Sequence, residues 1–369
     1  MCPHLKEDMQ PFLQNQHRPF QMSRRQFGRK SAYTVGGVAM MVGLPGFLTA
    51  CGEDTGGGEQ SGEIVAPRFV SSTSVIPIFV QQAAGPLLYG KEFGLNVPES
   101  NYKVVQSHGT AIQTVLSGEA DIVAGSVFGS ITAASQGVPL RLFSTARNRD
   151  DDVLAAQPNA GSLEQIIAGG DIRVSTDSKG GTAYAELQAM INAAGGDAKV
   201  GSLPGFTVLE SSGQRQAALA AGQIDAAIIH VDQYWQVQQE KPDLKVLARS
   251  VDVPPFPLTG YAAMTSWLNT NRATATAIVK SIAACTTAFR ESFDEYNTAV
   301  QHLIETPPND SDLRRLWEFA VENKIWEVDG TVSAQGYQTA ADLAVSAEVI
   351  AEAPPYSDAV DASPGEAAS

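Results

Sequence analysis

Short apolar runs alternate with longer amphipathic segments along most of this chain. The first unit is predicted as a strand over 64–71, a helix over 78–89 and a strand over 95–97. Further strands are expected over 121–124, 140–145, 172–175, 226–230 and 244–248, and helices over 111–116 and 182–194. Strands that alternate with helices favour largely parallel sheets covered by helices on both faces.

The C-terminal third is richer in helix. A strongly helical pattern over 271–304 ends before Pro307 and Pro308, and two more helices are predicted over 312–323 and 334–351. The last residues, 353–369, are small, polar and proline-containing. This composition predicts a disordered tail.

One sequence device occurs twice. A helix, a glycine, two further residues, an aspartate and an apolar strand follow one another around Gly118 and Asp121, and again around Gly222 and Asp225. Glycine just past a helix end accommodates the left-handed backbone conformation there. The echo predicts two lobes built from similar βαβ units.

The N-terminus is organised as an export signal. Basic residues including Arg24 and Arg25 precede an apolar, glycine-containing run, and small residues precede Cys51. The run is too short and too rich in glycine for a convincing membrane span. The arginine pair resembles a twin-arginine signal, and residues 48–51 resemble a bacterial lipobox, which implies lipid attachment at Cys51. The alternative is an ordinary secretory signal with a coincidental cysteine.

Composition and charge narrow the possible functions. The chain has 369 residues, of which 43% are hydrophobic, enough for two lobes with sizeable cores. The formal net charge is −15, which disfavours binding to nucleic acid. The three cysteines and five histidines form no CxxC or HExxH pattern, so neither a disulfide framework nor a metal site is expected. Residues 51–63 are dominated by glycine and polar residues and predict a flexible tether.

Several segments together resemble the periplasmic binding proteins of the nitrate/sulfonate/taurine type, which include binders of thiamine-pyrimidine precursors. The similarity spans 64–350 and is carried by residues 77–80, 89–97, 116–122, 136–140 and 218–227. It implies an α/β, two-lobed periplasmic-binding-protein type II fold with mostly parallel sheets flanked by helices and a hinge between the lobes. Behind the signal (1–50), lobe one would comprise 64–146 plus 255–352 and lobe two 147–254. The hinge crossings would fall near 144–147 and 249–254.

Ligands of open α/β sheets bind where strands end and loops turn into helices. Small hydroxyl side chains and glycines in such loops let backbone N–H groups approach an oxyanion at a helix N-terminus. The candidate ligand-binding residues are Ser71, Ser72, Thr73, Ser126, Phe128, Ser178, Lys179, Thr182, His230, Asp232 and Tyr234. The alternative roles are structural, because serine and threonine commonly cap helices and a buried aromatic or histidine commonly packs in a core.

The resemblance implies an extracytoplasmic, lipid-anchored monomer that delivers a small solute to the permease and ATPase of an ABC importer. The residues leave the solute open. Lys179 and the hydroxyl loops suit an oxyanion, Asp177 and Asp232 suit a cation or amine, and the aromatics suit a heteroaromatic ring. A pyridoxal-phosphate-dependent pyrimidine-precursor synthase and a surface sensor are the alternatives, but the synthase's cysteine-rich motif is missing from the sequence. No catalytic residue and no cofactor are therefore expected.

Overall fold

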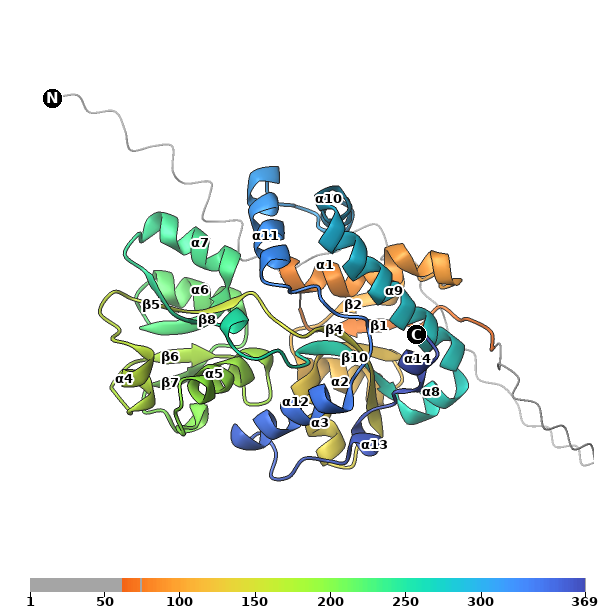
Figure 1. The fold of residues 1–369 in the computed structure, drawn as a ribbon, viewed down its shortest axis with the longest axis horizontal. Coiled ribbons are helices and arrows are strands. Elements are labelled where there is room, and N and C mark those ends of the chain that lie inside the picture. Colours follow the sequence, from red (N-terminus) through yellow and green to blue (C-terminus); the bar gives the residue numbers. More distant parts are fainter. Residues whose placement is uncertain (1–61, 74, 369) are drawn as a thin grey trace, which may run out of the picture. The chain divides into compact units, whose positions relative to one another are not determined.

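The computed structural model describes residues 62–73 and 75–368, which form two five-stranded sheets covered by helices (Figure 1). The predicted export signal, Cys51 and most of the tether lie outside the described residues. The strands are β1 (Phe69–Ser71), β2 (Tyr102–Val104), β3 (Ile122–Ser126), β4 (Leu140–Arg147), β5 (Asp152–Ala156), β6 (Val174–Thr176), β7 (Phe206–Val208), β8 (Ala226–His230), β9 (Lys245–Arg249) and β10 (Thr259–Met264).

The helices fall into two groups along the chain. Those up to the end of the second sheet are α1 (Ile76–Ala84), α2 (His108–Leu116), α3 (Val127–Ser135), α4 (Leu163–Ile167), α5 (Thr182–Ala193), α6 (Ser212–Ala220) and α7 (Val231–Glu240). Those that follow β10 are α8 (Thr265–Thr270), α9 (Arg272–Glu291), α10 (Phe293–Leu303), α11 (Asp310–Glu322), α12 (Ala334–Ser346), α13 (Tyr356–Ala359) and α14 (Ser363–Glu366).

The two sheets share one topology. The first has the order β2-β1-β3-β10-β4 and the second β7-β6-β8-β5-β9. In the first sheet β10 is antiparallel to both neighbours, and in the second β5 has that position, while the remaining pairings are parallel. We call the first sheet and the helices packed on it lobe one, and residues 152–249 lobe two. The two-lobed α/β fold expected from the sequence is confirmed.

Alternation along the strands places helices on both faces of each sheet. In β8, Ala227 and Ile229 pack in one core with α6 and α7, whereas Ala226 and Ile228 pack in another with α5. Figure 1 shows α6 and α7 on one side of the second sheet and α5 on the other. Because every residue of β8 is buried, both faces of this central strand are removed from water, as the uninterrupted apolar run predicts.

The repeated glycine–aspartate device has the same structure in both lobes. Asp121 forms a salt bridge of 2.7 Å with Arg68, and Asp225 forms one of 2.7 Å with Arg173. In each case the carboxylate also accepts the backbone N–H of its arginine, at 2.8 and 2.9 Å. These aspartates therefore fasten the start of one strand to the start of the neighbouring strand.

The C-terminal helices contact both lobes. The α12 helix packs against α3 of lobe one and α5 of lobe two. Near its end, the Tyr184 hydroxyl donates to the Ala347 carbonyl at 3.4 Å and the Asn192 amide donates to Ser346 at 3.1 Å. On α11, the Arg315 guanidinium lies 3.7 Å from the ring centroid of Trp235 on α7. These contacts join the lobes outside the two chain crossings.

Three local predictions are wrong. Residues 95–97 form no strand, because the second strand of lobe one begins only at Tyr102. The helical stretch 271–304 is divided at Ser292, whose side chain caps α10. Residues 353–368, expected to be a disordered tail, contain α13 and α14, and Val360 forms a bridge to Leu142 on the edge strand β4.

Within the described part of the chain, none of the helices combines the length and apolar character that a bilayer crossing requires.

Candidate functional site

A cavity of about 500 Å³ lies between the lobes, where the strand ends of both sheets meet. It is lined from lobe one by residues after β1 and β3 and at the start of α2 and β10, and from lobe two by residues after β6 and β8 and before α6. A reversed strand begins at the edge where its parallel neighbours end, so Thr259 and Asp152 reach the same cavity. Its volume falls in the range typical of sites for small organic molecules.

Seven of the eleven predicted ligand residues line this cavity: Ser72, Thr73, Ser126, Ser178, Lys179, Thr182 and His230. Their contact with a ligand remains a prediction. Lys179 and Ser178 are exposed at the rim, and Ser178 donates to Glu210 at 3.1 Å.

The other four predicted residues lie outside the cavity wall. The Ser71 hydroxyl donates to Gln82 at 3.3 Å, and the Phe128 ring packs edge-on against Phe256 with centroids 5.9 Å apart. The Tyr234 hydroxyl donates to the Leu244 carbonyl at 3.3 Å. Asp232 lies in the first turn of α7, where burial raises its pKa to about 6. Packing and local hydrogen bonds account for the first three.

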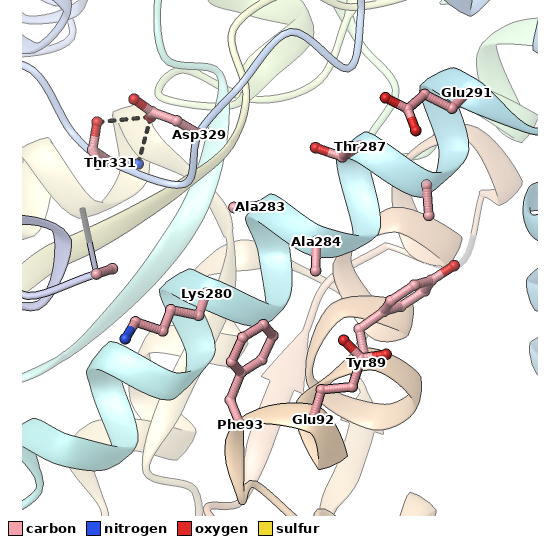
Figure 2. A pocket seen from close by; sticks show the side chains of 12 residues that line it. Tyr89, Glu92, Phe93, Lys280, Ala283, Ala284, Thr287, Glu291, Asp329 and Thr331 are labelled. Carbon is pink, nitrogen blue, oxygen red and sulfur yellow. Dashed lines mark hydrogen bonds between the residues drawn. The ribbon is translucent and has the colours of Figure 1, made fainter.

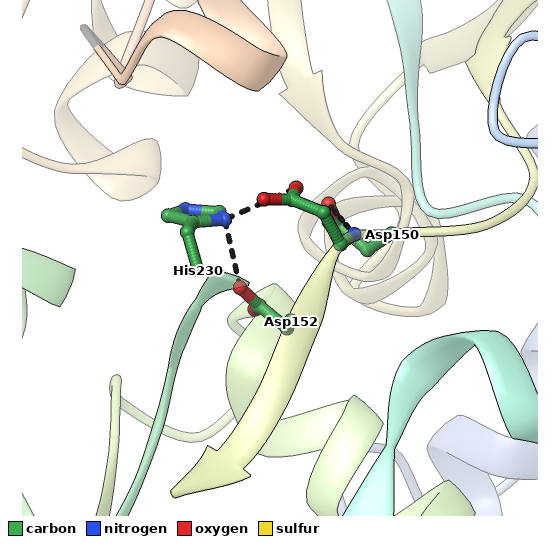
Figure 3. A group of neighbouring side chains, drawn as sticks. Asp150, Asp152 and His230 are labelled. Carbon is green, nitrogen blue, oxygen red and sulfur yellow. Dashed lines mark hydrogen bonds and ion pairs between the residues drawn. The ribbon is translucent and has the colours of Figure 1, made fainter. Parts of the chain in front are cut away.

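The sequence analysis missed a charged cluster at the first crossing between the lobes. Arg147, at the end of β4, approaches Asp150 at 2.7 Å and Asp151 at 3.1 Å. His230 Nδ1 lies 2.7 Å from Asp152 and 3.3 Å from Asp151 (Figure 3). All five side chains are at most 6% exposed. Three consecutive acidic residues usually indicate a solvated surface, so only their place beside a predicted hinge could have flagged them.

The charges in this cluster shift one another's pKa values. Burial raises the pKa of Asp150 to about 8. Burial would also raise that of Asp151, but His230 and Arg147 outweigh it and hold the pKa below its usual range. For His230 the two effects have opposite signs. Burial lowers the pKa of the imidazole, but the carboxylates of Asp152 and Asp151 raise it by more, so that it lies well above its usual value. The two carboxylates therefore favour the protonated form of His230.

Potential ligand atoms of Asp150, Asp151, Asp152 and His230 all lie within 4.8 Å of one another, a spacing that could hold a metal ion. Carboxylate oxygens with one imidazole suit divalent ions such as Zn²⁺ or Mn²⁺. Arg147 occupies part of the space around Asp150 and Asp151, and its positive charge opposes a second cation there. The cluster thus combines the donor set of a metal site with an ion-pair network that competes for it.

His108, at the start of α2, lies in a niche formed by two glycines. A Cβ at Gly125 would lie 2.7 Å from Nδ1 of the ring, and a Cβ at Gly129 would overlap Cδ2 and Nε2. Both ring nitrogens are buried without a partner among the described residues. Burial lowers the pKa of His108 to about 4, so the ring is neutral at pH 7 and offers one donor and one acceptor.

Several other buried polar atoms in the cavity wall also lack a partner within the described chain. They include Gln82 Nε2, Ser126 Oγ and Thr259 Oγ1 of lobe one and Asp150 Oδ2 of the crossing segment. Ser126 and Thr259 are opposite each other in the β3–β10 pairing. Buried polar groups are rarely left unpaired, because each costs about 1–3 kcal/mol. Their convergence on one cavity indicates a binding site for a polar ligand.

A larger depression of about 820 Å³ lies on the outer side of lobe one, along α9 (Figure 2). It is lined in part by Ala283, Ala284 and Ala288. Two of its polar residues already have hydrogen-bond partners: Asp329 accepts two hydrogen bonds from Thr331, and Tyr89 donates to Glu295 at 2.9 Å. Since it involves one lobe alone, we assign the functional site to the cavity between the lobes.

Two α/β lobes with a solute-sized polar cavity between them form the architecture of the periplasmic-binding-protein fold. The chain belongs to the NMT1/THI5-like family, whose model matches residues 72–294. The resemblance noted in the sequence is therefore confirmed. No curated protein matches the chain.

Three of the solved structures with the same fold have names that state a ligand or a function. The ligand-binding component of an ABC-type import system from Staphylococcus aureus, with zinc bound, has a TM-score of 0.63 at 16% identity and covers 83% of this chain and 99% of its own. The aliphatic sulphonate binding protein SsuA from Escherichia coli has a TM-score of 0.60 at 14% identity, with coverage of 80% and 92%. The nitrate-binding protein NrtA from Synechocystis has a TM-score of 0.52 at 12% identity, with coverage of 65% and 66%. At these identities the likeness concerns the fold.

Proposed function

We propose that this protein is an extracytoplasmic solute-binding protein that delivers a small polar solute to the permease and ATPase of an ABC importer. The observation that carries the proposal is the cavity between the lobes, where buried polar groups of lobe one and of the crossing segment converge without partners among the described residues. The names of the similar structures support it, since these proteins are binding components of import systems or bind sulphonate or nitrate.

Binding would work through closure of the two lobes. The chain crosses between the sheets at 148–151 and 250–258, and these segments would act as hinges. A solute that contacts Ser126 and Thr259 on one side and Thr182 and His230 on the other has more contacts in the closed state. Its differential affinity therefore shifts the population toward closure, and no covalent step is required.

The finer parts of the proposal concern the chain outside the two sheets. Residues 1–50 would direct export, Cys51 would carry lipid, and 51–63 would tether a monomeric domain to the outer face of the cytoplasmic membrane. Stable anchoring needs more than one acyl chain, as di- or triacylation of Cys51 would provide. If Cys51→Ser remains in the membrane fraction of the producing cell, the anchor is excluded. Export despite Arg24→Lys with Arg25→Lys would exclude the twin-arginine route.

Calorimetry with the solute released from natively purified protein tests the binding function. Ser126→Ala and Thr182→Val, one from each lobe, should each lower affinity about three- to tenfold for a neutral hydrogen bond and up to about a hundredfold for a charged one. Tyr234→Phe is the matched control, because its hydroxyl bonds to Leu244 outside the cavity. Small-angle scattering should show compaction on binding. Normal binding by both cavity variants, or a solute returned chemically altered, would refute the proposal.

A further inference from the structure

The charged cluster at the lobe crossing has more acidic than basic groups. Asp150, Asp151 and Asp152 face two cations, Arg147 and His230, and all five are buried. Two neighbouring groups on other elements add no compensating positive charge. Burial and Asp152 raise the pKa of Glu186 on α5, whose carboxyl accepts from Ser250 at 2.6 Å, and Asp232 on α7 is itself acidic. One negative charge therefore lacks a counter-charge when all three aspartates are ionised.

The unmatched charge can be placed at Asp150. His230 pairs with Asp151 and Asp152, so Asp150 has only Arg147, which it shares with Asp151. Its Oδ1 pairs with Arg147 and accepts the backbone N–H of Asp151 at 2.9 Å, and its Oδ2, like that of Asp151, is buried without a partner among the described residues. Asp150 belongs to the wall of the cavity. An ionised carboxylate oxygen in such a place is strongly unfavourable unless a proton or a cation reaches it.

The remaining basic groups of the cavity do not fill this need. The Arg215 guanidinium donates to the carbonyls of Ile228 at 2.6 Å and Leu209 at 2.8 Å. Lys179 is exposed at the rim, which also carries the exposed carboxylate of Glu210. Asp177 adds another carboxyl, which accepts the backbone N–H of Tyr184 at 2.9 Å. The wall formed by the crossing and lobe two thus suits a cation better than an oxyanion.

The facing wall supplies an independent indication of a ligand. Thr259 is paired in β10 with both Ser126 and Arg147, so its hydroxyl lies beside the cluster. Thr259 is 3% and Ser126 7% exposed, and neither hydroxyl has a partner among the described residues. The described residues that line the cavity include no Phe, Tyr or Trp, which gives a stacked ring little support.

We propose that the solute carries a positively charged nitrogen that lies against Asp150, with its polar remainder hydrogen-bonded to Ser126 and Thr259. This inference rests on the proposed solute-binding function and specifies the substrate class as an organic cation.

The rival occupant is a divalent metal ion held by the three aspartates and His230. A single ion would leave most of the cavity of about 500 Å³ unused and would lie next to the Arg147 guanidinium. It would also require neutral His230, whose present contacts with two carboxylates favour the cation. The observations consequently favour the organic cation, and the metal is an arm of the test.

The test measures thermal stabilisation of the full-length protein by agmatine, cadaverine and choline, by the anions ethanesulfonate and nitrate, and by zinc chloride. Mass spectrometry identifies the solute that co-purifies with native protein. We expect a co-purified molecule with a cationic nitrogen and stabilisation by at least one of the three cations alone. A co-purified anion, stabilisation by the anions, or stabilisation by zinc without any effect of the organic cations would overturn the inference while leaving the binding function intact. If no solute binds at all, both proposals fail.

Asp150→Asn locates the contact, because it keeps the shape and removes the charge. For the stabilising cation we expect at least a tenfold loss of affinity, measured by calorimetry. Asp232→Asn is the control, since it removes a nearby carboxylate outside the cavity wall, and its affinity should stay within about threefold of the parent. Circular dichroism checks that both variants fold, and the co-purified solute of the unaltered protein decides the matter if Asp150→Asn does not. Equal losses in the two variants would refute the contact at Asp150.

Discussion

The niche around His108 offers a sharp test of the cavity's construction. In Gly129→Ala the new methyl group would overlap Cδ2 and Nε2 of the imidazole. The ring has little room to move away, because it also lies close to the backbone of Gly125, where an added Cβ would be only 2.7 Å from Nδ1. Overpacking of this kind costs about 1–3 kcal/mol, or it drives the ring into the cavity, where it would block the solute.

Alanine is also a better helix former than glycine by up to about 1 kcal/mol, which would partly hide this cost. Gly213 provides the matched reference. It too lies in the first turn of a helix, α6, but a Cβ there would meet nothing within 4 Å. The difference in free energy of unfolding between Gly129→Ala and Gly213→Ala should therefore approach the clash itself, about 1–3 kcal/mol.

Urea unfolding of the two variants measures this difference by linear extrapolation. His108→Ala removes the ring that the new methyl group would strike. In the His108→Ala background, Gly129→Ala should therefore cost at least about 1 kcal/mol less than it does in the unaltered protein. The reasoning is refuted if both glycine variants are equally stable and the effects of His108→Ala and Gly129→Ala simply add.

Three further results are expected. Because burial raises the pKa of Asp150 to about 8, binding of a permanently charged cation at pH 7 should release close to one proton, and affinity should rise about tenfold per pH unit up to about pH 8. Calorimetry in two buffers that differ in ionisation enthalpy measures this release. The absence of any release would contradict the placement of the cation at Asp150. Trp235→Ala should lower the free energy of unfolding by about 2–3 kcal/mol through loss of the Arg315 and Phe319 contacts, and Trp235→Phe by less; equal stability of the two variants would contradict a stabilising contact between α7 and α11. In a chain lacking Cys2 and Cys51, the buried Cys285 thiol should react with a disulfide reagent only on unfolding, and fast labelling of folded protein would show that its helix opens.

The sequence predicted the fold well where a pattern repeats locally. Alternating apolar strands and amphipathic helices gave the two-lobed α/β architecture, and the repeated Gly118 and Gly222 device marks equivalent turns in both lobes. The interior strand β10 was missed, because its small residues and Gly260 resemble a loop. Gly260 is needed there, since a Cβ would overlap the Ser144 carbonyl oxygen of the neighbouring strand.

The site was predictable only in outline. Loops at strand ends supplied Ser126, Thr182 and His230, because the rule about carboxyl ends depends on topology alone. Asp151 and Asp152 become recognisable only through their partner His230, which lies far along the chain. Tyr234 and Phe128 were misplaced for the opposite reason, since composition does not say whether an aromatic side chain faces a cavity or a core.

The position of β10 also sets the order in which the chain can be assembled during synthesis. Lobe two is made from one continuous stretch, so its sheet is complete once Arg249 has left the ribosome. The sheet of lobe one lacks the strand between β3 and β4 until Met264 has been made, by which point all of lobe two is available. Until then β4 has no neighbour in its sheet and exposes unpaired backbone groups, which makes it the segment most open to misassociation in the nascent chain.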